Sequence, residues 1–294
     1  MDLSLVILNY NTREHLRCCL ESVRDGISML ETEVLVVDNA SSDGSAEMVT
    51  SEFPWVTLIR SPRNGGYAYG NNLGLAHARG AAILLLNPDT LLPHGALTRL
   101  LECLHEHPEA GVVGPKLMRP NGSMHLACRR SFPTPAVAFY RVSGLSQLFP
   151  RSPRFGRYNL TYLDPDQAMQ VDSVCGACLL IRRVVVERIG LLDERFFMYG
   201  EDLDWCLRAR QAGWTVRYEP SVVVHHQHGA ASRQRALRTT VHFFRAMDLF
   251  YRKHYVHRYH PVVTGAVRTA IYGALAFSVF RSLLTMPSQR RVGL

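Results

Sequence analysis

The sequence predicts an α/β protein with a mostly parallel central sheet, helices on both faces and a C-terminal helical tail. Three observations carry this prediction. Short apolar runs alternate with segments of helical spacing over the first 105 residues, which is typical of parallel sheets. The 294 residues, of which 47% are hydrophobic and 20% charged, suffice for a large core and exclude disorder, collagen and coiled coils. The last 66 residues are helical in pattern and strongly basic.

The first half of the chain supplies the predicted parallel strands. Apolar runs predict strands over residues 3–8, 33–37, 56–60 and 81–86. Helical spacing predicts helices over residues 12–23, with Thr12 as N-cap, and 45–53. A loop rich in Gly and Asn over residues 64–72 is expected to open a further helix that continues through Ala78.

The second half has a weaker pattern. Pro, Arg and Ser accumulate between residues 114 and 172, which predicts long loops over one end of the sheet. Strands are expected at residues 174–181 and 216–226, and helices at 202–213, 239–254 and 262–284. We therefore divide the chain into an α/β domain, residues 1–228, with a boundary between halves near residue 113, and a basic tail, residues 229–294.

The net charge of +8 belongs to the tail. Residues 229–294 contain eleven Lys and Arg and a single acid, Asp248, whereas the first 228 residues are slightly acidic. A nucleic-acid-binding protein more often carries a basic stripe on its folded domain together with a recognisable motif, and the sequence has neither. We therefore expect no nucleic-acid partner and an anionic surface as the partner of the tail.

Polar residues follow three of the predicted strands, at Asn9 to Asn11, Asp38 to Asp43 and Asn87 to Asp89. Ligands of such sheets bind beyond the carboxyl ends of the strands, so these residues should line one crevice. A carboxylate there can accept from a nucleobase or ribose, or bind a divalent cation. Each Asp could alternatively cap a turn or the following helix.

Two later clusters also carry possible chemistry. Glu201 and Asp202 begin a predicted helix, where an acid can be a general base or simply a favourable helix N-terminus. His225, His226 and His228 follow an apolar strand, so one imidazole could bind a metal or all three could be structural.

Other classes are disfavoured by missing motifs. The sequence has no Gly-x-x-x-x-Gly-Lys-Ser/Thr loop and no Gly-x-Gly-x-x-Gly after the first strand, which argues against P-loop hydrolysis and standard dinucleotide chemistry. The seven Cys, including the Cys175-x-x-Cys178 pair, lack a zinc or disulfide framework, so we expect buried, reduced, cytosolic thiols.

The chain resembles the inverting family-2 glycosyltransferases of the Rossmann-like GT-A fold, in the branch typified by bacterial rhamnosyltransferases. The matching stretches occur in family order and are VILNYN (6–11), VVDNASSDGS (36–45), NGGYA (64–68), GNN (70–72), LNPD (86–89), GPKL (114–117), GEDLD (200–204) and the His225-His226 strand end. The resemblance implies a nucleotide-binding half up to about residue 113 and an acceptor-binding, catalytic half from about residue 114 to 228.

The resemblance also implies roles for individual residues. Asp38 resembles the nucleobase and ribose contact, and the donor pocket would further include Asn9, Asn11, Asn64, Asn71 and Asn87. Asp89 resembles the ligand of a Mg²⁺ or Mn²⁺ ion, with His226 favoured over His225 and His228 to complete the shell. Asp202 resembles the catalytic base with Glu201 beside it, and Arg129 and Arg130 would meet the diphosphate or the acceptor.

The activity implied is metal-dependent, inverting transfer of a sugar from a nucleotide-sugar donor, L-rhamnose from dTDP-rhamnose, to a glycan or polyprenyl-linked glycan in cell-surface polysaccharide synthesis. Two alternatives stay open. One is a UDP-hexose or UDP-galactofuranose donor on the same fold, and the other is a non-catalytic nucleotide-sugar-binding membrane protein. A nucleotidyltransferase fits less well, because no basic Gly-rich loop follows the first strand.

The tail could meet a membrane. Residues 261–280 contain one charge, Arg268, which would be costly inside a spanning helix, so a helix lying in the membrane interface fits better. Residues 239–254 place aromatic side chains on one face, which indicates a helix packed on the catalytic domain. Together with the resemblance, the tail predicts a cytoplasmic protein held peripherally on the inner face of the plasma membrane.

Overall fold

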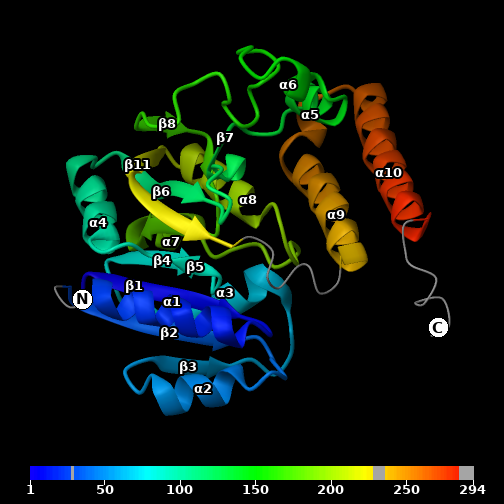
Figure 1. The fold of residues 1–294 in the computed structure, drawn as a ribbon. Helices are drawn as coiled ribbons and strands as arrows, with labels where there is room; N and C mark the ends of the chain where they lie inside the picture. The colour runs from blue at the N-terminus through cyan, green and yellow to red at the C-terminus, as the bar shows by residue number, and fades with distance from the viewer. Residues whose placement is uncertain (28–29, 228–235, 285–294) are drawn as a thin grey trace.

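A computed structural model describes residues 1–27, 30–227 and 236–284 and shows a nine-stranded sheet between layers of helices (Figure 1). The strand order is β3-β2-β1-β4-β10-β6-β11-β5, and β8 pairs with β11 outside this path. The strands of this sheet are β1 (Leu3–Asn9), β2 (Thr32–Asp38), β3 (Thr57–Arg60), β4 (Ala82–Leu86), β5 (Thr90–Leu91), β6 (Ala110–Met118), β8 (Met169–Val171), β10 (Cys178–Arg182) and β11 (Thr215–His226). A separate pair consists of β7 (Arg129–Arg130) and β9 (Ser173–Val174).

The predicted fold class is confirmed, because most strands of the sheet run parallel. Strands β3, β2, β1 and β4 are parallel neighbours, as are β6 and β11, whereas β10, β5 and β8 run antiparallel to the strands they pair with. The core consists of the continuous apolar strands, which are buried on both faces. In β11 the register shifts between Glu219 and Val223, where Pro220 cannot donate to the ladder.

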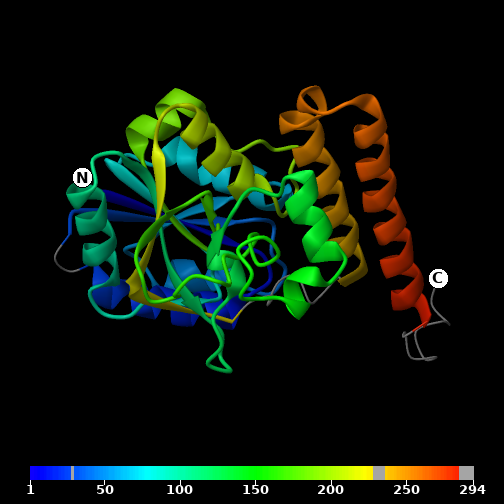
Figure 2. The ribbon, with the colours of Figure 1, turned by 90° about the horizontal axis from the view of Figure 1, so that it is seen from above.

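Helices cover both faces of this sheet, as Figure 2 shows for α1 on one side and α3 on the other. The helices of the catalytic part are α1 (Arg13–Gly26), α2 (Ser45–Glu52), α3 (Gly66–His77), α4 (Ala96–Glu106), α5 (Pro135–Val142), α6 (Leu145–Leu148), α7 (Arg183–Ile189) and α8 (Glu201–Gln211). The tail contains α9 (Ala236–His254), the short 3₁₀ turn η3 (Val256–Arg258) and α10 (Pro261–Leu284).

Helix α3 begins inside the segment predicted as a loop. The expectation of a loop over residues 64–72 was wrong from Gly66 onward, because glycines lower helix propensity but are required here by packing. A Cβ on Gly70 would lie 2.3 Å from Leu8 Cδ1, and one on Gly74 would lie 2.3 Å from Val6 Cγ1. The glycines let α3 lie directly on β1, next to the polar strand ends.

Thr12 is the N-cap residue of α1, as predicted, but its side chain makes no capping hydrogen bond to the helix. Its hydroxyl donates to Asn9 Oδ1 at 2.7 Å. The Arg13 amide instead donates to Asp43 Oδ2 at 2.9 Å, so an acid from the loop after β2 satisfies the first turn.

In the second half, strand β6 was not predicted, and its residues 114–118 lie where long loops were expected. Its Gly111 and Gly114 weaken the sequence signal, yet both are needed for close packing. A Cβ on Gly111 would lie 2.8 Å from Trp214 Cβ, and one on Gly114 would lie 2.5 Å from Val174 Cβ. The strand predicted over 174–181 is divided into β9 and β10 by a turn in which the Cys178 amide donates to the Cys175 carbonyl.

Helix α9 packs on the catalytic domain. Phe250, Tyr251 and Ala246 from α9 form a buried cluster with Leu203 and Leu207 from α8. This burial confirms the expectation that residues 239–254 pack on the domain through their aromatic face. The tail is thus attached to the helix that begins with Glu201 and Asp202.

Helix α10 lies on the outer side of α9 in both views (Figures 1 and 2). By length and composition, Pro261–Ser282 could cross a membrane, and only 6% of its apolar window is buried inside the protein. Arg268, the charge expected to be costly there, is paired: its Nε lies 2.7 Å from Asp248 Oδ1 on α9, and Tyr272 donates to Asp248 Oδ2 at 3.1 Å. The pair ties α10 to α9.

Candidate active site

The parallel register brings the polar strand ends together. Asn9 lies opposite Asp38 at the carboxyl ends of β1 and β2. Asn9 Nδ2 donates to Asp38 Oδ1 at 3.2 Å and to Ser41 Oγ at 3.1 Å, and the Ser41 amide donates to Asp38 Oδ2 at 3.0 Å. These bonds fix the buried carboxylate of Asp38 in one orientation at the sheet edge.

The other predicted donor-binding amides shape the surrounding loops. Asn11 has a positive φ of 52° and accepts from the Ser42 amide at 2.7 Å. Asn64 Oδ1 accepts from Asn39 Nδ2 at 3.1 Å and from the Gly66 amide at 3.0 Å, which fixes the start of α3. Asn71 is 1% exposed and donates to the Tyr67 carbonyl inside α3. Contact of these amides with a nucleotide stays a prediction.

Asp89 and His226 meet across the sheet. His226 Nε2 lies 3.2 Å from Asp89 Oδ1 and 3.4 Å from Asn87 Nδ2, and both Asp89 and His226 are buried. Alternation along β11 points His226 inward and leaves His225 exposed. His228 lies outside the described residues. The structure thus brings Asp89 together with the histidine that the resemblance favoured.

The chemistry of this pair fits a divalent cation. One carboxylate oxygen and one imidazole nitrogen are ligands that Mn²⁺ accepts, and Mg²⁺ commonly binds through one or two carboxylates plus substrate phosphates. Within residues 1–27, 30–227 and 236–284 no group of three His, Cys, Asp or Glu could hold a metal. A cation at Asp89 and His226 would therefore keep coordination positions open for a phosphate.

Asp202 is held from two sides. Its Oδ2 accepts from Arg130 Nη2 at 2.7 Å and from the Gly176 amide at 3.0 Å. Arg130 is 7% exposed and Asp202 is 8% exposed, so this is a buried ion pair with a hydrogen-bonded geometry. Arg130 therefore contacts the predicted base, not an open phosphate site as expected.

The adjacent acid has a different environment. Glu201 is 6% exposed, and its Oε2 has no hydrogen-bond partner among the residues that the structure describes. Burial, and to a lesser degree the charge of Asp202, raises the pKa of the Glu201 carboxyl to about 8. Of two neighbouring carboxyls, Asp202 is ion-paired while Glu201 favours its neutral form at pH 7.

A short backbone segment connects these two groups of residues. The Asn87 amide donates to the Ala177 carbonyl at 2.9 Å, and the Gly176 amide donates to Asp202. Gly176 and Ala177 are adjacent in the chain. One of them contacts Asp202 and the other contacts Asn87, so the segment links Asp202 to the loop that carries Asn87 and Asp89.

Comparison with known proteins now decides the family. The family model described as "Glycosyl transferase family 2" matches residues 4–190. The chain belongs to glycosyltransferase family 2. The family-2 match covers the strands that carry Asn9, Asp38 and Asp89, and it stops before α8.

Similarity to a curated relative of this family-2 enzyme covers more of the chain than the family model does, and its extent requires that it include α8. The chain is 31% identical over 256 residues, 82% of its length and 81% of the relative's, to an N-acetylglucosaminyl-diphospho-decaprenol L-rhamnosyltransferase of Mycobacterium tuberculosis. It is 26% identical over 174 residues, 55% of its length and 61% of the relative's, to rhamnosyltransferase WbbL of Escherichia coli. The protein is a glycosyltransferase with rhamnosyltransferase relatives.

Solved structures confirm the GT-A fold of this family-2 glycosyltransferase. A mannosyltransferase from Pyrobaculum calidifontis, solved in complex with GDP-Man and Mn²⁺, superposes with a TM-score of 0.60 at 18% identity, covering 96% of this chain and 78% of that chain. The Staphylococcus aureus TarS fragment 1–349 gives a TM-score of 0.57 at 15% identity, covering 99% and 77%.

Arg129 does not have the position expected of a substrate-binding residue in this glycosyltransferase. Its side chain is 1% exposed, and its guanidinium donates to the carbonyls of Leu163 and Asp164, both at 2.7 Å, beside the ring of Tyr218. The expectation of a diphosphate or acceptor contact is corrected: Arg129 holds the long loop before β8. Arg129 and Arg130 point apart because they are neighbours on strand β7.

Sequence reasoning missed the residues that support Asp202. Gly176 belongs to the Cys175–Cys178 stretch, which we interpreted through its thiols, yet its backbone amide holds Asp202. Tyr67, at the start of α3, donates to the Gly176 carbonyl at 2.6 Å, and burial raises the pKa of its hydroxyl well above the usual value. Tyr67 is the aromatic residue of the NGGYA motif, and its presence there could have indicated this contact.

The loop before α8 packs against the start of α3. The Tyr67 amide donates to the Phe197 carbonyl, and Gly66 has a φ of 89° at this contact. A Cβ on Gly66 would lie 2.3 Å from that carbonyl oxygen, so glycine is required both by conformation and by space. Tyr199 and Gly200 also have positive φ where the loop turns into α8.

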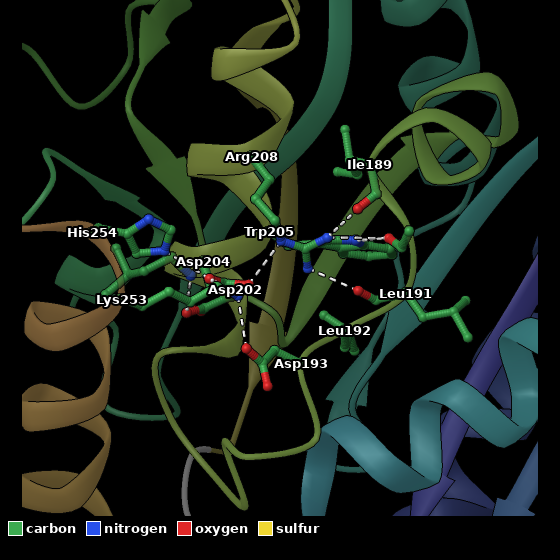
Figure 3. A network of polar contacts seen from close by, with 12 residues as sticks. Ile189, Leu191, Leu192, Asp193, Asp202, Asp204, Trp205, Arg208, Lys253 and His254 are labelled. Carbon is green, nitrogen blue, oxygen red and sulfur yellow. Dashed lines mark hydrogen bonds and ion pairs between the residues drawn. The ribbon is translucent and has the colours of Figure 1, made fainter.

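The fifth residue of the GEDLD motif, Asp204, attaches the tail of this glycosyltransferase to helix α8. Asp204 is fully buried, and its carboxylate lies 2.7 Å from both Lys253 Nζ and His254 Nε2 of α9 and 2.9 Å from Arg208 Nε (Figure 3). Lys253 also pairs with Asp193 at 2.7 Å. Burial opposes ionisation, but the bonds from His254 and Lys253 lower the pKa of Asp204. The network fixes α9 against the start of α8.

Proposed function

We propose that this glycosyltransferase transfers L-rhamnose from dTDP-rhamnose, with inversion at the anomeric carbon, to a lipid-linked glycan used in cell-surface polysaccharide synthesis. Two relatives named as rhamnosyltransferases support the donor sugar. The relative at 31% identity is named for an N-acetylglucosaminyl-diphospho-decaprenol acceptor, which supports a prenyl-diphosphate-linked acceptor here.

The observation that carries the proposal is the link between the Asp89 strand end and Asp202. Asp38 is oriented by Asn9 and Ser41 as a nucleoside contact, and Asp89 with His226 would hold Mg²⁺ or Mn²⁺ at the donor diphosphate. A bound divalent cation would neutralise the charge that develops on the nucleotide leaving group. The Gly176–Ala177 segment hydrogen-bonds to both Asn87 and Asp202, which supports a position for the proposed base beside the proposed donor site.

In the proposed reaction Asp202 accepts the proton of the acceptor hydroxyl while that oxygen attacks the anomeric carbon. The new bond to carbon forms on the face opposite the departing diphosphate, so one displacement inverts the configuration. Arg130 and the Gly176 amide hold Asp202 Oδ2, which leaves the orientation of the carboxylate fixed before substrate arrives. General-base assistance of this kind contributes about 10²–10⁴-fold in rate.

The proposal includes a cytoplasmic site at the inner face of the plasma membrane. Helix α10 exposes large apolar side chains, among them Val262, Phe277 and Phe280. A basic helix pair with an exposed apolar face fits an anionic lipid surface. A lipid-linked acceptor would be reached at that surface.

Nucleotide binding and turnover, measured separately, test the proposal. We expect dTDP to stabilise the protein against heat more than UDP or GDP does, and more with Mg²⁺ or Mn²⁺ than without. At 100 times its Kd a ligand adds about 2.7 kcal/mol. Asp89→Ala should abolish the metal-dependent part, whereas Asp202→Asn should bind dTDP normally and lose release of dTDP from dTDP-rhamnose plus acceptor by about 10²-fold or more.

The alternatives give other results. Preferential stabilisation by UDP would replace the proposed donor with a UDP-sugar, and nucleotide binding without turnover in any acceptor mixture would indicate a non-catalytic protein. Near-normal turnover by Asp202→Asn would remove Asp202 from the role of base.

A further inference from the structure

A cavity of about 670 Å³ lies outside the site described above, between the α5 region, α8 and the end of α9. This volume lies within the range of small-molecule binding pockets. Three arginines and three tyrosines dominate its lining: Arg154, Arg157, Arg258, Tyr140, Tyr255 and Tyr259.

The arginines of this cavity lack acidic partners. Among the described residues, no carboxylate lies within ion-pair distance of Arg154, Arg157 or Arg258, although many other arginines of the chain are paired. Asp172 also lines the cavity, but its carboxylate is engaged by the Arg210 guanidinium and by the Phe132 amide. The cavity therefore holds an excess of positive charge with no internal neutralisation.

Aromatic rings hold two of these guanidinium groups in place. Arg154 Nε donates to the Tyr140 hydroxyl at 2.9 Å, and its Cζ lies 5.6 Å from the centre of the Tyr140 ring. Arg258 Cζ lies 5.9 Å from the centre of the Tyr255 ring. Stacked guanidinium groups keep free N–H donors, and their planar geometry suits phosphate oxygens. An anion with an apolar portion complements such a lining.

The cavity lies between the surroundings of Asp202 and the start of α10. Ser131 lines it and directly follows Arg130, which holds Asp202. Leu207 of α8 also lines it, about 7.5 Å along the helix axis from Asp202 at 1.5 Å per residue. On its other side, Tyr259 is three residues from Val262, where the exposed apolar surface of α10 begins.

We propose that this cavity binds the diphosphate and the first prenyl units of a prenyl-diphosphate-linked acceptor. Arg154, Arg157 and Arg258 donate to the diphosphate oxygens, and the tyrosine rings contact the adjoining prenyl chain, which continues along α10. The sugar attached to the diphosphate then points toward Asp202. This inference takes the class of acceptor from the proposed function. The cavity that it assigns to the acceptor is separate from the site proposed for the nucleotide-sugar donor.

The test is calorimetric titration of the full-length protein with farnesyl diphosphate, kept below its aggregation concentration, with saturating dTDP and Mg²⁺ filling the donor site. We expect binding that is tighter than that of inorganic pyrophosphate or of farnesol. The double variant Arg157→Gln/Arg258→Gln should bind farnesyl diphosphate at least tenfold more weakly, because each substitution removes a charge-assisted hydrogen bond. The charge-matched control Arg24→Gln/Arg188→Gln changes exposed arginines of α1 and α7 and should bind normally.

Several results would overturn the proposal. Equal affinity of the double variant and the wild type would remove the arginines from the site, provided that both melt at the same temperature. Binding of farnesyl diphosphate that occurs without dTDP but is lost when dTDP is saturating would place farnesyl diphosphate in the donor site instead. Pyrophosphate binding as tightly as farnesyl diphosphate would exclude the prenyl contact. None of these measurements needs turnover, so failure here leaves dTDP binding and rhamnosyl transfer to be judged on their own assays.

Discussion

The substitution Glu201→Gln should change how the stability of this glycosyltransferase depends on pH. Glu201 has a pKa of about 8 in the folded protein against 4.5 for the unperturbed group, chiefly because it is buried. The folded state therefore binds about one more proton than the unfolded state between pH 4.5 and 8. Folding stability then falls as pH rises through this window, by about 1.36 kcal/mol per pH unit.

The magnitude follows from the width of the window. Between pH 5.5 and 7.5 the contribution of Glu201 falls by about 2–3 kcal/mol. For a chain of this size 1 kcal/mol corresponds to about 2 °C in Tm, so the change is about 5 °C. Glutamine has the shape of the protonated acid and does not titrate. The Tm of Glu201→Gln should thus gain about 5 °C relative to wild type on going from pH 5.5 to 7.5.

Differential scanning calorimetry of both proteins across this pH range measures the effect, and subtraction of the two curves removes the titration of histidines. Glu21→Gln, an exposed position of α1, is the matched control and should run parallel to wild type. Parallel curves for Glu201→Gln would refute the reasoning, because they would mean that Glu201 ionises at the same pH in both states.

Three further substitutions test the packing around the site and the tail. Asp204→Asn removes the charge that holds Arg208 and the α9 cations, so it should cost about 3 kcal/mol and lower Tm by about 6 °C, and a change under 2 °C would contradict a structural role. Gly66→Ala should lower Tm clearly more than Gly122→Ala, because both have positive φ but only Gly66 would meet a backbone oxygen, so equal losses would exclude the close contact. Phe277→Asp should weaken co-sedimentation with phosphatidylglycerol vesicles several-fold at unchanged Tm, and a wild-type protein that ignores such vesicles would end the membrane proposal.

The fold was predictable where local pattern and global structure agree. Strands β1, β2 and β4 are continuous apolar runs, and their positions followed from the sequence within one residue. The start of α3 and the whole of β6 were missed for one physical reason. Their glycines are unfavourable locally, but they are required by backbone-to-side-chain contacts with Leu8, Val174 and Trp214 that arise only in the folded chain.

The sequence was enough to predict which strand ends form the candidate site. It was not enough to predict which side chains of the site contact one another. That Asn9 and Asp38 would meet follows from parallel strands of equal length. Successive side chains of β11 point to opposite faces of the sheet. Once the strand register was known, this alternation was enough to predict that His226 and not His225 points inward. The pairing of Arg130 with Asp202 joins residues 72 positions apart through a two-stranded ribbon and a turn, and no local pattern encodes such a contact.

Not all of the positive charges of the tail are available to bind an anionic surface. Of its cations, Lys253 is committed to Asp204 and Asp193, and Arg268 is committed to Asp248, the tail's own acid. These pairs attach α10 to α9, and α9 to α8 and to the loop that precedes α8. Arg258, by contrast, has no carboxylate partner among the described residues and faces the cavity. Lys253 and Arg268 are thus used inside the protein, so the attraction of the tail to an anionic surface or ligand should be weaker than all eleven of its basic residues together would produce.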